Sequence, residues 1–175
     1  LARQMRPELK KVGVAWNPGE ANSEAQVKLA RKFCGEAGIE LMESTVDNSS
    51  GVFEAVNALV ARGAEAIWVG GDVMVMTAFE SAVNAAKRGG VPVFTVIPPH
   101  AEKGALFDLG ADYVEVGRVA GDLAADILSG RNPATVPIDN LVPEIFLANR
   151  TATQNLRQTW RITDDSGNRA NVAID

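Results

Sequence analysis

A fourfold alternation of short apolar runs with segments of helical periodicity constrains the fold of this chain more than any other feature. Between residues 11 and 97 the runs are KVGVAW, IELMESTV, AEAIWVGG and VPVFTVI. In the segments between them, apolar residues recur every three or four positions, as on one face of a helix. Strands joined by helical crossovers run parallel. The pattern predicts an α/β fold, a Rossmann-like open parallel sheet with helices on both faces.

Short polar residues mark where the helices of this region are expected to begin. Ser23 opens a capping-box pattern, and Ser49 or Ser50 is expected to cap the next helix. Asp72 follows the third apolar run directly, so we expect it to cap one continuous helix that ends near Arg88.

The rhythm changes after residue 97, where prolines and glycines become frequent. The patterns here predict less regular structure than in the first half of the chain. We expect, in order, a loop over 98–110, a strand over 112–116, a helix over 117–129, a strand over 144–148 and a short helix over 150–159.

Composition and charge exclude several classes of protein. Hydrophobic residues make up 46% of the 175 residues and charged residues 22%, which is typical of a soluble globular protein. The net charge of −5, with no basic stripe, argues against a nucleic-acid partner. Cys34 is the only cysteine, so neither an internal disulfide nor a thiolate metal site is expected. No apolar run reaches the roughly 20 residues of a membrane helix.

Catalytic motifs are missing from the sequence. There is no Gly-rich phosphate loop, no G-x-S-x-G turn and no G-x-G-x-x-G after the first strand. His100 is the only histidine, and we expect it in an exposed loop. A phosphoacceptor domain would need an acidic pair after the first strand, where this chain has only Glu20. We therefore predict a protein that is not an enzyme and needs no cofactor.

Polar loops are expected to meet at one edge of the predicted sheet. In such sheets ligands bind outside the carboxyl ends of the strands. The loops that emerge there cover residues 17–23, 47–50, 70–72 and 97–100, and they are rich in Gly, Asn, Ser and Asp. Because parallel strands end at the same edge, these loops predict one polar binding site for a small ligand.

Four side chains in these loops allow both a structural and a ligand-binding interpretation. Backbone N–H groups at Asn22 and Ser23, at a helix start, favour an anion such as a carboxylate. Ser23 can equally serve as a helix cap alone. Asp72 can cap its helix and still offer an oxygen to a ligand ammonium or hydroxyl group. Glu20 is a solvated turn residue or a ligand contact. When Ser23 and Asp72 are each considered alone, helix capping is enough to explain them. When Asp72 is considered together with the neighbouring polar loops, a ligand role is favoured.

Several segments of the chain resemble one family. They are KVGVAWNPGEANSEAQ, GVFEAVNALVARGAEAIWVGGD, VPVFTV and KGALFDLGADYVEVGRVAGDLAADILSGRNPATVPI. Together they resemble the ABC-transporter substrate-binding family of type I periplasmic-binding fold, which includes tryptophan- and tyrosine-binding lipoproteins. The likeness extends over about residues 10–160. Its most specific elements are N-P-x-E-x-N-S at 17–23 and G-A-L…G-x-D-Y…G-R-x-x-G at 104–121.

The resemblance implies a solute-binding component of an ABC import system. Members of the family have two α/β lobes joined by a hinge, with the ligand in the cleft between them. Closure of the lobes presents them to a membrane permease. The implied ligand is a small polar molecule, an amino acid, with aromatic amino acids among those that the family binds. The implied location is periplasmic or extracellular, with a lipid anchor in a segment that precedes Leu1.

On this resemblance the chain divides into two parts. Residues 1–100 would form one ligand-binding lobe, and residues 101–175 a C-terminal segment that crosses the hinge. The helix over 117–129 would pack on the other lobe, which is absent from this chain. Its apolar face would then be exposed, which predicts a homodimer or a domain-swapped pair. Val119, Leu123 and Ile127 lie on that face.

On this resemblance, the ligand-contacting positions of the family correspond to Glu20, Asn22, Ser23 and Asp72. One departure from the family lies next to Asp72. Where the family commonly has a T-D-N-T-like element, this chain reads Gly71-Asp72-Val73-Met74, so Val73 replaces an amide that could bind the ligand. The alternative function is a ligand-sensing domain of a signalling receptor with the same fold. The predicted ligand-binding residues are Glu20, Asn22, Ser23, Asp72, Val73 and Ile97.

Overall fold

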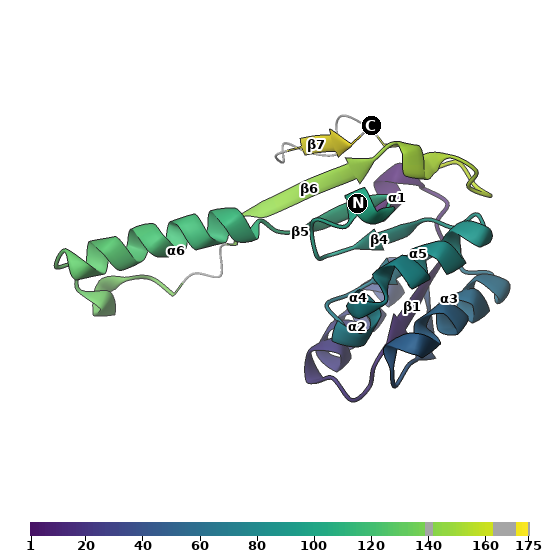
Figure 1. Cartoon of the computed structure of the whole chain (residues 1–175), viewed down its shortest axis with the longest axis horizontal. Helices are drawn as coiled ribbons and strands as arrows, with labels where there is room; N and C mark the ends of the chain where they lie inside the picture. The colour runs from purple at the N-terminus through teal and green to yellow at the C-terminus, as the bar shows by residue number, and fades with distance from the viewer. Residues whose placement is uncertain (139–141, 163–170, 175) are drawn as a thin grey trace.

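A single mixed sheet organises the chain (Figure 1). The computed structural model describes residues 1–138 and 142–162, and the backbone of 171–174. The sheet has seven strands in the order β2-β1-β3-β4-β5-β6-β7, and every neighbouring pair is parallel except the antiparallel pair β5–β6. The α/β fold with a largely parallel sheet is therefore confirmed. The strands are β1 (Lys11–Trp16), β2 (Glu40–Thr45), β3 (Ala66–Val69), β4 (Val93–Thr95), β5 (Phe107–Ala111), β6 (Glu144–Asn149) and β7 (Asn171–Ile174).

Helices cover both faces of this sheet, as the sequence predicts. Helices α3, α4 and α5 pack on one face, and α2, α1 and the segment after β6 pack on the other. The helices are α1 (Ala2–Met5), α2 (Ala21–Glu36), α3 (Val52–Ala61), α4 (Val73–Thr77), α5 (Phe79–Arg88) and α6 (Tyr113–Leu128). Short 3-10 turns are η1 (Ser49–Gly51), η2 (Ala101–Lys103), η3 (Pro133–Thr135) and η4 (Thr151–Thr153).

Strand β1 lies in the middle of the parallel region and alternates between the two cores. Val12 and Val14 are buried on the side of α1 and α2. On the other side, Gly13 lets α3 come close to the sheet. A Cβ at Gly13 would lie 2.8 Å from Ile67 Cδ1 and 3.2 Å from Leu59 Cβ. Any larger side chain there would push α3 off the sheet that positions the loops of the candidate site.

Two predicted boundaries within the first half are wrong in detail. The helix expected from Asp72 to Arg88 is interrupted at Ala78 and forms the two helices α4 and α5. Neither Ser49 nor Ser50 supplies the expected cap. Asn48 caps the turn η1 instead by accepting a hydrogen bond from Gly51 N at 3.2 Å, and α3 itself has Gly51 at its N-cap position with no side-chain capping bond. The periodicity predicts correctly that these segments are helical. It does not predict which residue caps each helix, because several polar residues lie near each helix start.

Residues 98–110 were predicted to form a loop, yet they contain most of strand β5. Its residues pair with β4 on one side and with β6 on the other. The segment 107–111 is only five residues long and follows a Pro-rich turn, so its own pattern is weak. Pairing with two neighbouring strands, which local sequence does not reveal, stabilises it.

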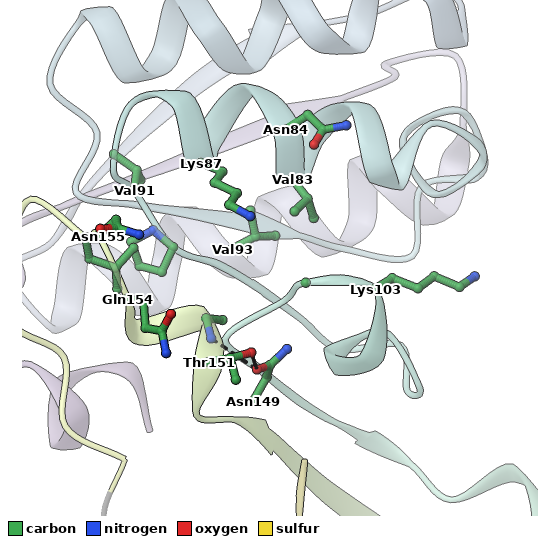
Figure 2. A pocket seen from close by; sticks show the side chains of 14 residues that line it. Val83, Asn84, Lys87, Val91, Val93, Lys103, Asn149, Thr151, Gln154 and Asn155 are labelled. Carbon is green, nitrogen blue, oxygen red and sulfur yellow. Dashed lines mark hydrogen bonds between the residues drawn. The ribbon is translucent and has the colours of Figure 1, made fainter. Parts of the chain in front are cut away.

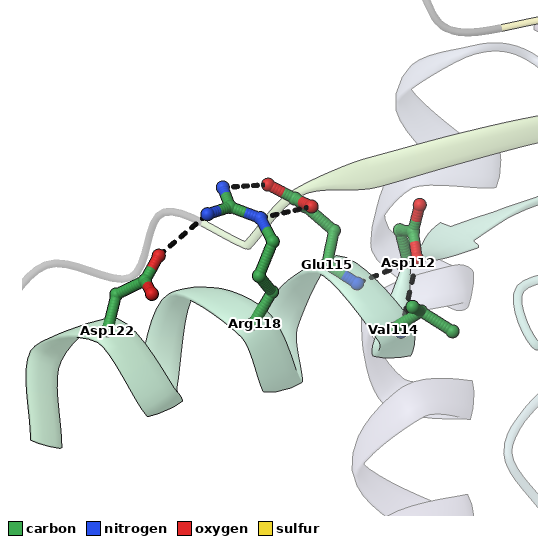
Figure 3. A network of polar contacts seen from close by, with 5 residues as sticks. All are labelled: Asp112, Val114, Glu115, Arg118 and Asp122. Carbon is green, nitrogen blue, oxygen red and sulfur yellow. Dashed lines mark hydrogen bonds and ion pairs between the residues drawn. The ribbon is translucent and has the colours of Figure 1, made fainter. Parts of the chain in front are cut away.

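The strand predicted over 112–116 is also wrong, because α6 already begins at Tyr113. Asp112 caps the helix by accepting hydrogen bonds from Val114 N at 3.1 Å and Glu115 N at 3.0 Å. Arg118 then pairs with Glu115 and Asp122, each at 2.6 Å, along the helix surface (Figure 3). The Arg118 guanidinium lowers the pKa of Glu115. Capping and helically spaced ion pairs outweigh the alternating pattern of D-Y-V-E-V.

After β6 the chain forms less helix than expected. The predicted helix over 150–159 is replaced by the single turn η4, after which the chain extends and buries Trp160 in the core. The predicted strand over 144–148 is confirmed as β6.

Helix α6 projects from the rest of the molecule at the end of β5 (Figure 1). None of its residues is buried, and all of them are described. Val119 is 45% exposed and Leu128 is 89% exposed. Strands β5 and β6, which lead to and from this region, belong to the same sheet as β1–β4. Packing of α6 on another lobe, pairing of two copies and the division at residue 100 stay predictions.

The described residues contain no helix with the length and apolar character needed to span a bilayer. They also contain no group of three or more His, Cys, Asp or Glu side chains arranged to hold a metal ion.

Candidate ligand-binding edge

The loops at the carboxyl ends of the parallel strands gather at one edge of the sheet, as predicted. Asn22 Nδ2 donates a hydrogen bond to Gly71 O at 2.8 Å, which joins the first loop to the third. The η1 turn contacts α4. Ile97 lines a shallow pocket together with Gly71. We call this edge, formed by residues 17–23, 47–50, 70–73 and 97–100, the polar rim.

Asp72 is the buried centre of the polar rim, with an exposed fraction of 2%. Its Oδ1 accepts a hydrogen bond from Val75 N at 3.0 Å and so caps α4. Its Oδ2 accepts hydrogen bonds from Asn17 N at 2.6 Å and from Ser23 Oγ at 2.7 Å. The carboxylate thus ties the β1–α2 loop and α2 to the start of α4. Whether Asp72 also contacts a ligand stays a prediction.

Ser23 does not cap α2, contrary to the capping-box prediction. The helix begins at Ala21, with Glu20 at the N-cap position and no side-chain capping bond. Ser23 lies in the first turn, 2% exposed, and its hydroxyl donates to Asp72. Gln26, the expected partner in the capping box, instead accepts a hydrogen bond from Gly71 N at 2.7 Å. Both side chains therefore link loops rather than close their own helix.

Glu20 lies over the start of α4. Its Oε2 accepts a hydrogen bond from Val73 N at 2.8 Å and its Oε1 accepts one from Met74 N at 3.2 Å. First-turn N–H groups have no partner within their own helix, and the helix dipole favours negative charge beside them. At α4 these N–H groups are satisfied by a side chain of the protein itself. At α2, no described residue accepts from the N–H groups of Asn22 and Ser23.

A shallow open pocket of about 410 Å³ lies beside these groups on the polar rim. Val73 is 58% exposed there, so this edge presents an apolar surface next to its polar groups. His100, expected in an exposed loop, is half-buried. Its ring packs edge-on against Phe79 with centroids 4.6 Å apart. The pocket is lined by Gly71, Val73, Met76, Thr77, Ile97 and His100.

Asp108 holds the His100 loop in place, a role that was not predicted from the sequence. It is fully buried in β5, and its Oδ2 accepts hydrogen bonds from His100 N at 2.6 Å and Ala101 N at 2.7 Å. Its Oδ1 has no hydrogen-bond partner among the described residues. Burial raises the pKa of Asp108, although the two backbone hydrogen bonds oppose this effect. A single acidic residue inside the apolar stretch GALFDL was the only available signal.

The model of one protein family, described as ABC transporter substrate binding protein, matches residues 1–163. The chain belongs to this family. It is 28% identical over 141 residues to a tyrosine-binding protein of Clostridioides difficile, a match that covers 81% of this chain and 41% of that protein. The relatives named here are described as binding proteins rather than as enzymes.

Two solved structures share the fold. One is the ligand-free, open structure of a substrate binding protein with adhesive properties from Clostridium difficile, with a TM-score of 0.80, 23% identity and coverage of 100% of this chain and 58% of that chain. The other is a domain from Streptococcus pneumoniae in complex with L-Trp. Its TM-score is 0.74 and its identity 22%, and the match covers 88% of this chain and 52% of that chain. The chain thus spans between about two fifths and three fifths of the length of the proteins that it matches.

Proposed function

We propose that this chain supplies one ligand-binding lobe of an ABC importer's solute-binding protein, and that the polar rim binds an amino acid, preferably an aromatic one. The observation that carries the proposal is the junction of the first and third loops through Asp72, Ser23 and Asn22, in a member of the substrate-binding family. The tyrosine-binding relative and the neighbour that binds L-Trp support an aromatic amino acid as the ligand.

The two kinds of group on the rim suit the two ends of such a ligand. The N–H groups of Asn22 and Ser23 at the start of α2, which have no acceptor among the described residues, suit the ligand carboxylate. The exposed side chain of Val73, with Ile97 and Met76 beside it, suits an aromatic ring. Asp72 has an oxygen already bonded twice within the chain, so its main contribution in this proposal is to fix the loops that carry the contacts.

In the intact importer we propose that a second lobe closes over the polar rim and that α6 packs on that lobe. This would bury the apolar side chains that α6 exposes in the present chain. The closed protein would then dock on a membrane permease, outside the cytoplasmic membrane and held there by a lipid anchor. Pairing of two copies through α6 has no support beyond its exposure.

Isothermal titration calorimetry of the full-length protein tests the ligand class. We expect saturable binding of L-tryptophan or L-tyrosine and none of myo-inositol, a neutral solute without a carboxylate. Binding of a sugar or polyol with no heat from any amino acid would reject the assignment.

Val73 offers a sharper test, because it replaces the amide found at this position in the family. Val73→Asn restores a hydrogen-bonding group on the rim, and we expect the affinity for an amino acid to rise by about fivefold, the value of one modest hydrogen bond. Val73→Ala is the matched control and should weaken binding by removing apolar contact. Equal affinities for the wild type and both variants would place the ligand away from Val73.

A further inference from the structure

A second cavity lies where the parallel strands begin, at the edge of the sheet opposite the polar rim. Figure 2 shows the side chains that line it. The end of α5, the start of β4 and the segment after β6 form its walls. Strands β1–β4 begin at this edge, and the antiparallel strand β6 ends there. The volume is about 270 Å³, near the lower end for small-molecule sites. We call this space the distal cavity.

Several polar side chains of the distal cavity are free to bind. The side chain of Lys87 has neither an ion pair nor a hydrogen bond within the described residues, and the same holds for the side chains of Gln154, Asn155 and Asn84. Figure 2 shows Lys87 pointing from α5 across the cavity towards Val93. Each of these side chains can donate hydrogen bonds, and the lysine adds a positive charge.

The distal cavity holds no negative charge of its own. No carboxylate is among its 14 lining residues, although acidic residues outnumber basic ones by 22 to 17 in the whole chain. Lys103 adds a second ammonium group at the rim, and its side chain points away from the centre in Figure 2. The electrostatics therefore favour an anion here and disfavour a cation.

Apolar side chains form the floor of the distal cavity. Val91, Pro92 and Val93 are buried, whereas Val83, Ala152 and Leu156 are partly exposed to the cavity. A fully hydrated inorganic anion would gain nothing from this exposed apolar surface, whereas a ligand with a short apolar body would bury it. The lining thus suits a molecule with one anionic end and one apolar end.

The segment that closes the distal cavity is fixed by hydrogen bonds rather than loosely attached. Buried Asn149 donates from Nδ2 to Ala101 O at 2.8 Å and accepts at Oδ1 from Thr151 Oγ1 at 2.7 Å. Further along, Arg157 N donates to Gly90 O at 2.8 Å. The cavity walls are therefore held in place before any ligand arrives, which lowers the entropic cost of binding.

We propose that the distal cavity is a second ligand site, separate from the polar rim, for a small carboxylate with a short apolar body. The carboxylate contacts the Lys87 ammonium and the amide groups of Gln154 and Asn155. The apolar part lies on the partly exposed side chains of Val83, Ala152 and Leu156. Because one ammonium faces the cavity, a monoanion is matched better than a multiply charged phosphate.

Nuclear magnetic resonance titration of the full chain with butyrate and with benzoate tests the proposal. We expect saturable shifts at the backbone amides of Val93, Gln154 and Asn155, smaller shifts with inorganic phosphate, and none there with butylammonium. Lys87→Met keeps the aliphatic stem but removes the charge, and should weaken binding at least about tenfold, the value of one charge-assisted hydrogen bond. Lys32→Met, on exposed α2, is the matched control and should change nothing.

Three results would overturn the distal site. They are the lack of saturable shifts at these amides with both carboxylates, equal shifts with butylammonium, and unchanged affinity in Lys87→Met. The outcome is distinguishable from that of the polar rim, because amino-acid binding is measured separately by calorimetry and should be unaltered in Lys87→Met.

Discussion

Polar side chains at the two edges of the sheet differ in whether they have hydrogen-bond partners within the chain. At the polar rim, the carboxylates of Asp72 and Glu20 already accept hydrogen bonds from backbone N–H groups of the same chain. At the distal cavity, the side chains of Lys87, Gln154 and Asn155 have no partner among the described residues. A polar residue beside a strand end can therefore hold loops together instead of facing a ligand. Mutations of Asp72 and Glu20 should cost stability, whereas mutation of Lys87 should not.

The largest effect is expected from Asp72→Ala. The substitution leaves three donors without their acceptor in a buried place, those of Asn17 N, Ser23 Oγ and Val75 N. We expect the free energy of unfolding to fall by about 3 kcal/mol, a lost cap plus buried unsatisfied donors. Chemical denaturation measures it.

Asp112→Ala is the matched comparison for Asp72→Ala, because Asp112 also caps a helix but is only half-buried, at the start of α6. A loss of about 1 kcal/mol is expected there. If the two substitutions cost the same, Asp72 acts as an ordinary cap and the buried junction of loops contributes nothing.

A smaller effect is expected at Glu20. Glu20→Ala removes both hydrogen bonds to the start of α4 and should lower the free energy of unfolding by about 1.5 kcal/mol. Glu20→Gln keeps one acceptor oxygen and loses the charge, so about half of that loss is expected. Thermal denaturation of both variants measures the difference. A stability of Glu20→Ala equal to that of the wild type would show that Glu20 is a solvated turn residue.

Asp108 should make the stability of the fold depend on pH. Burial raises its pKa in the folded state, so the folded protein binds this proton more tightly than the unfolded chain does. Its favourable contribution is complete below the unfolded pKa and is lost as the pH rises through the raised folded value. Asp108→Asn lacks this titration and should gain stability relative to the wild type as the pH rises above the unfolded pKa of an aspartate, about 3.9. Chemical denaturation of both proteins at several pH values measures this gain. A stability difference that stays the same at every pH would contradict the assignment.

The smallest effect is expected at the distal cavity. Lys87→Met should change the free energy of unfolding by less than about 0.5 kcal/mol, because Lys87 is exposed and has no partner in the described structure. Urea denaturation of this variant beside Asp72→Ala gives the sharpest contrast between the two edges. A loss comparable to that of Asp72→Ala would mean that Lys87 has a structural role.

The sequence predicts the parallel sheet and the meeting of its loops because both follow from period and chain direction. Ser23 and Asp72 were placed at the correct edge, but the sequence could not show that they bond to each other across 49 positions. Strand β5 was missed because its stability comes from pairing with β4 and β6. The distal cavity is lined by segments that lie far apart in the sequence, from α5 to Leu156. No local sequence pattern therefore predicts its position.

A crystal structure of the full-length protein grown with L-tryptophan tests the central claim most directly. The account predicts the ligand carboxylate within hydrogen-bonding distance of the Asn22 and Ser23 N–H groups, with the indole ring against Val73 and Ile97. Density for tryptophan elsewhere, with the polar rim open to solvent, would contradict it.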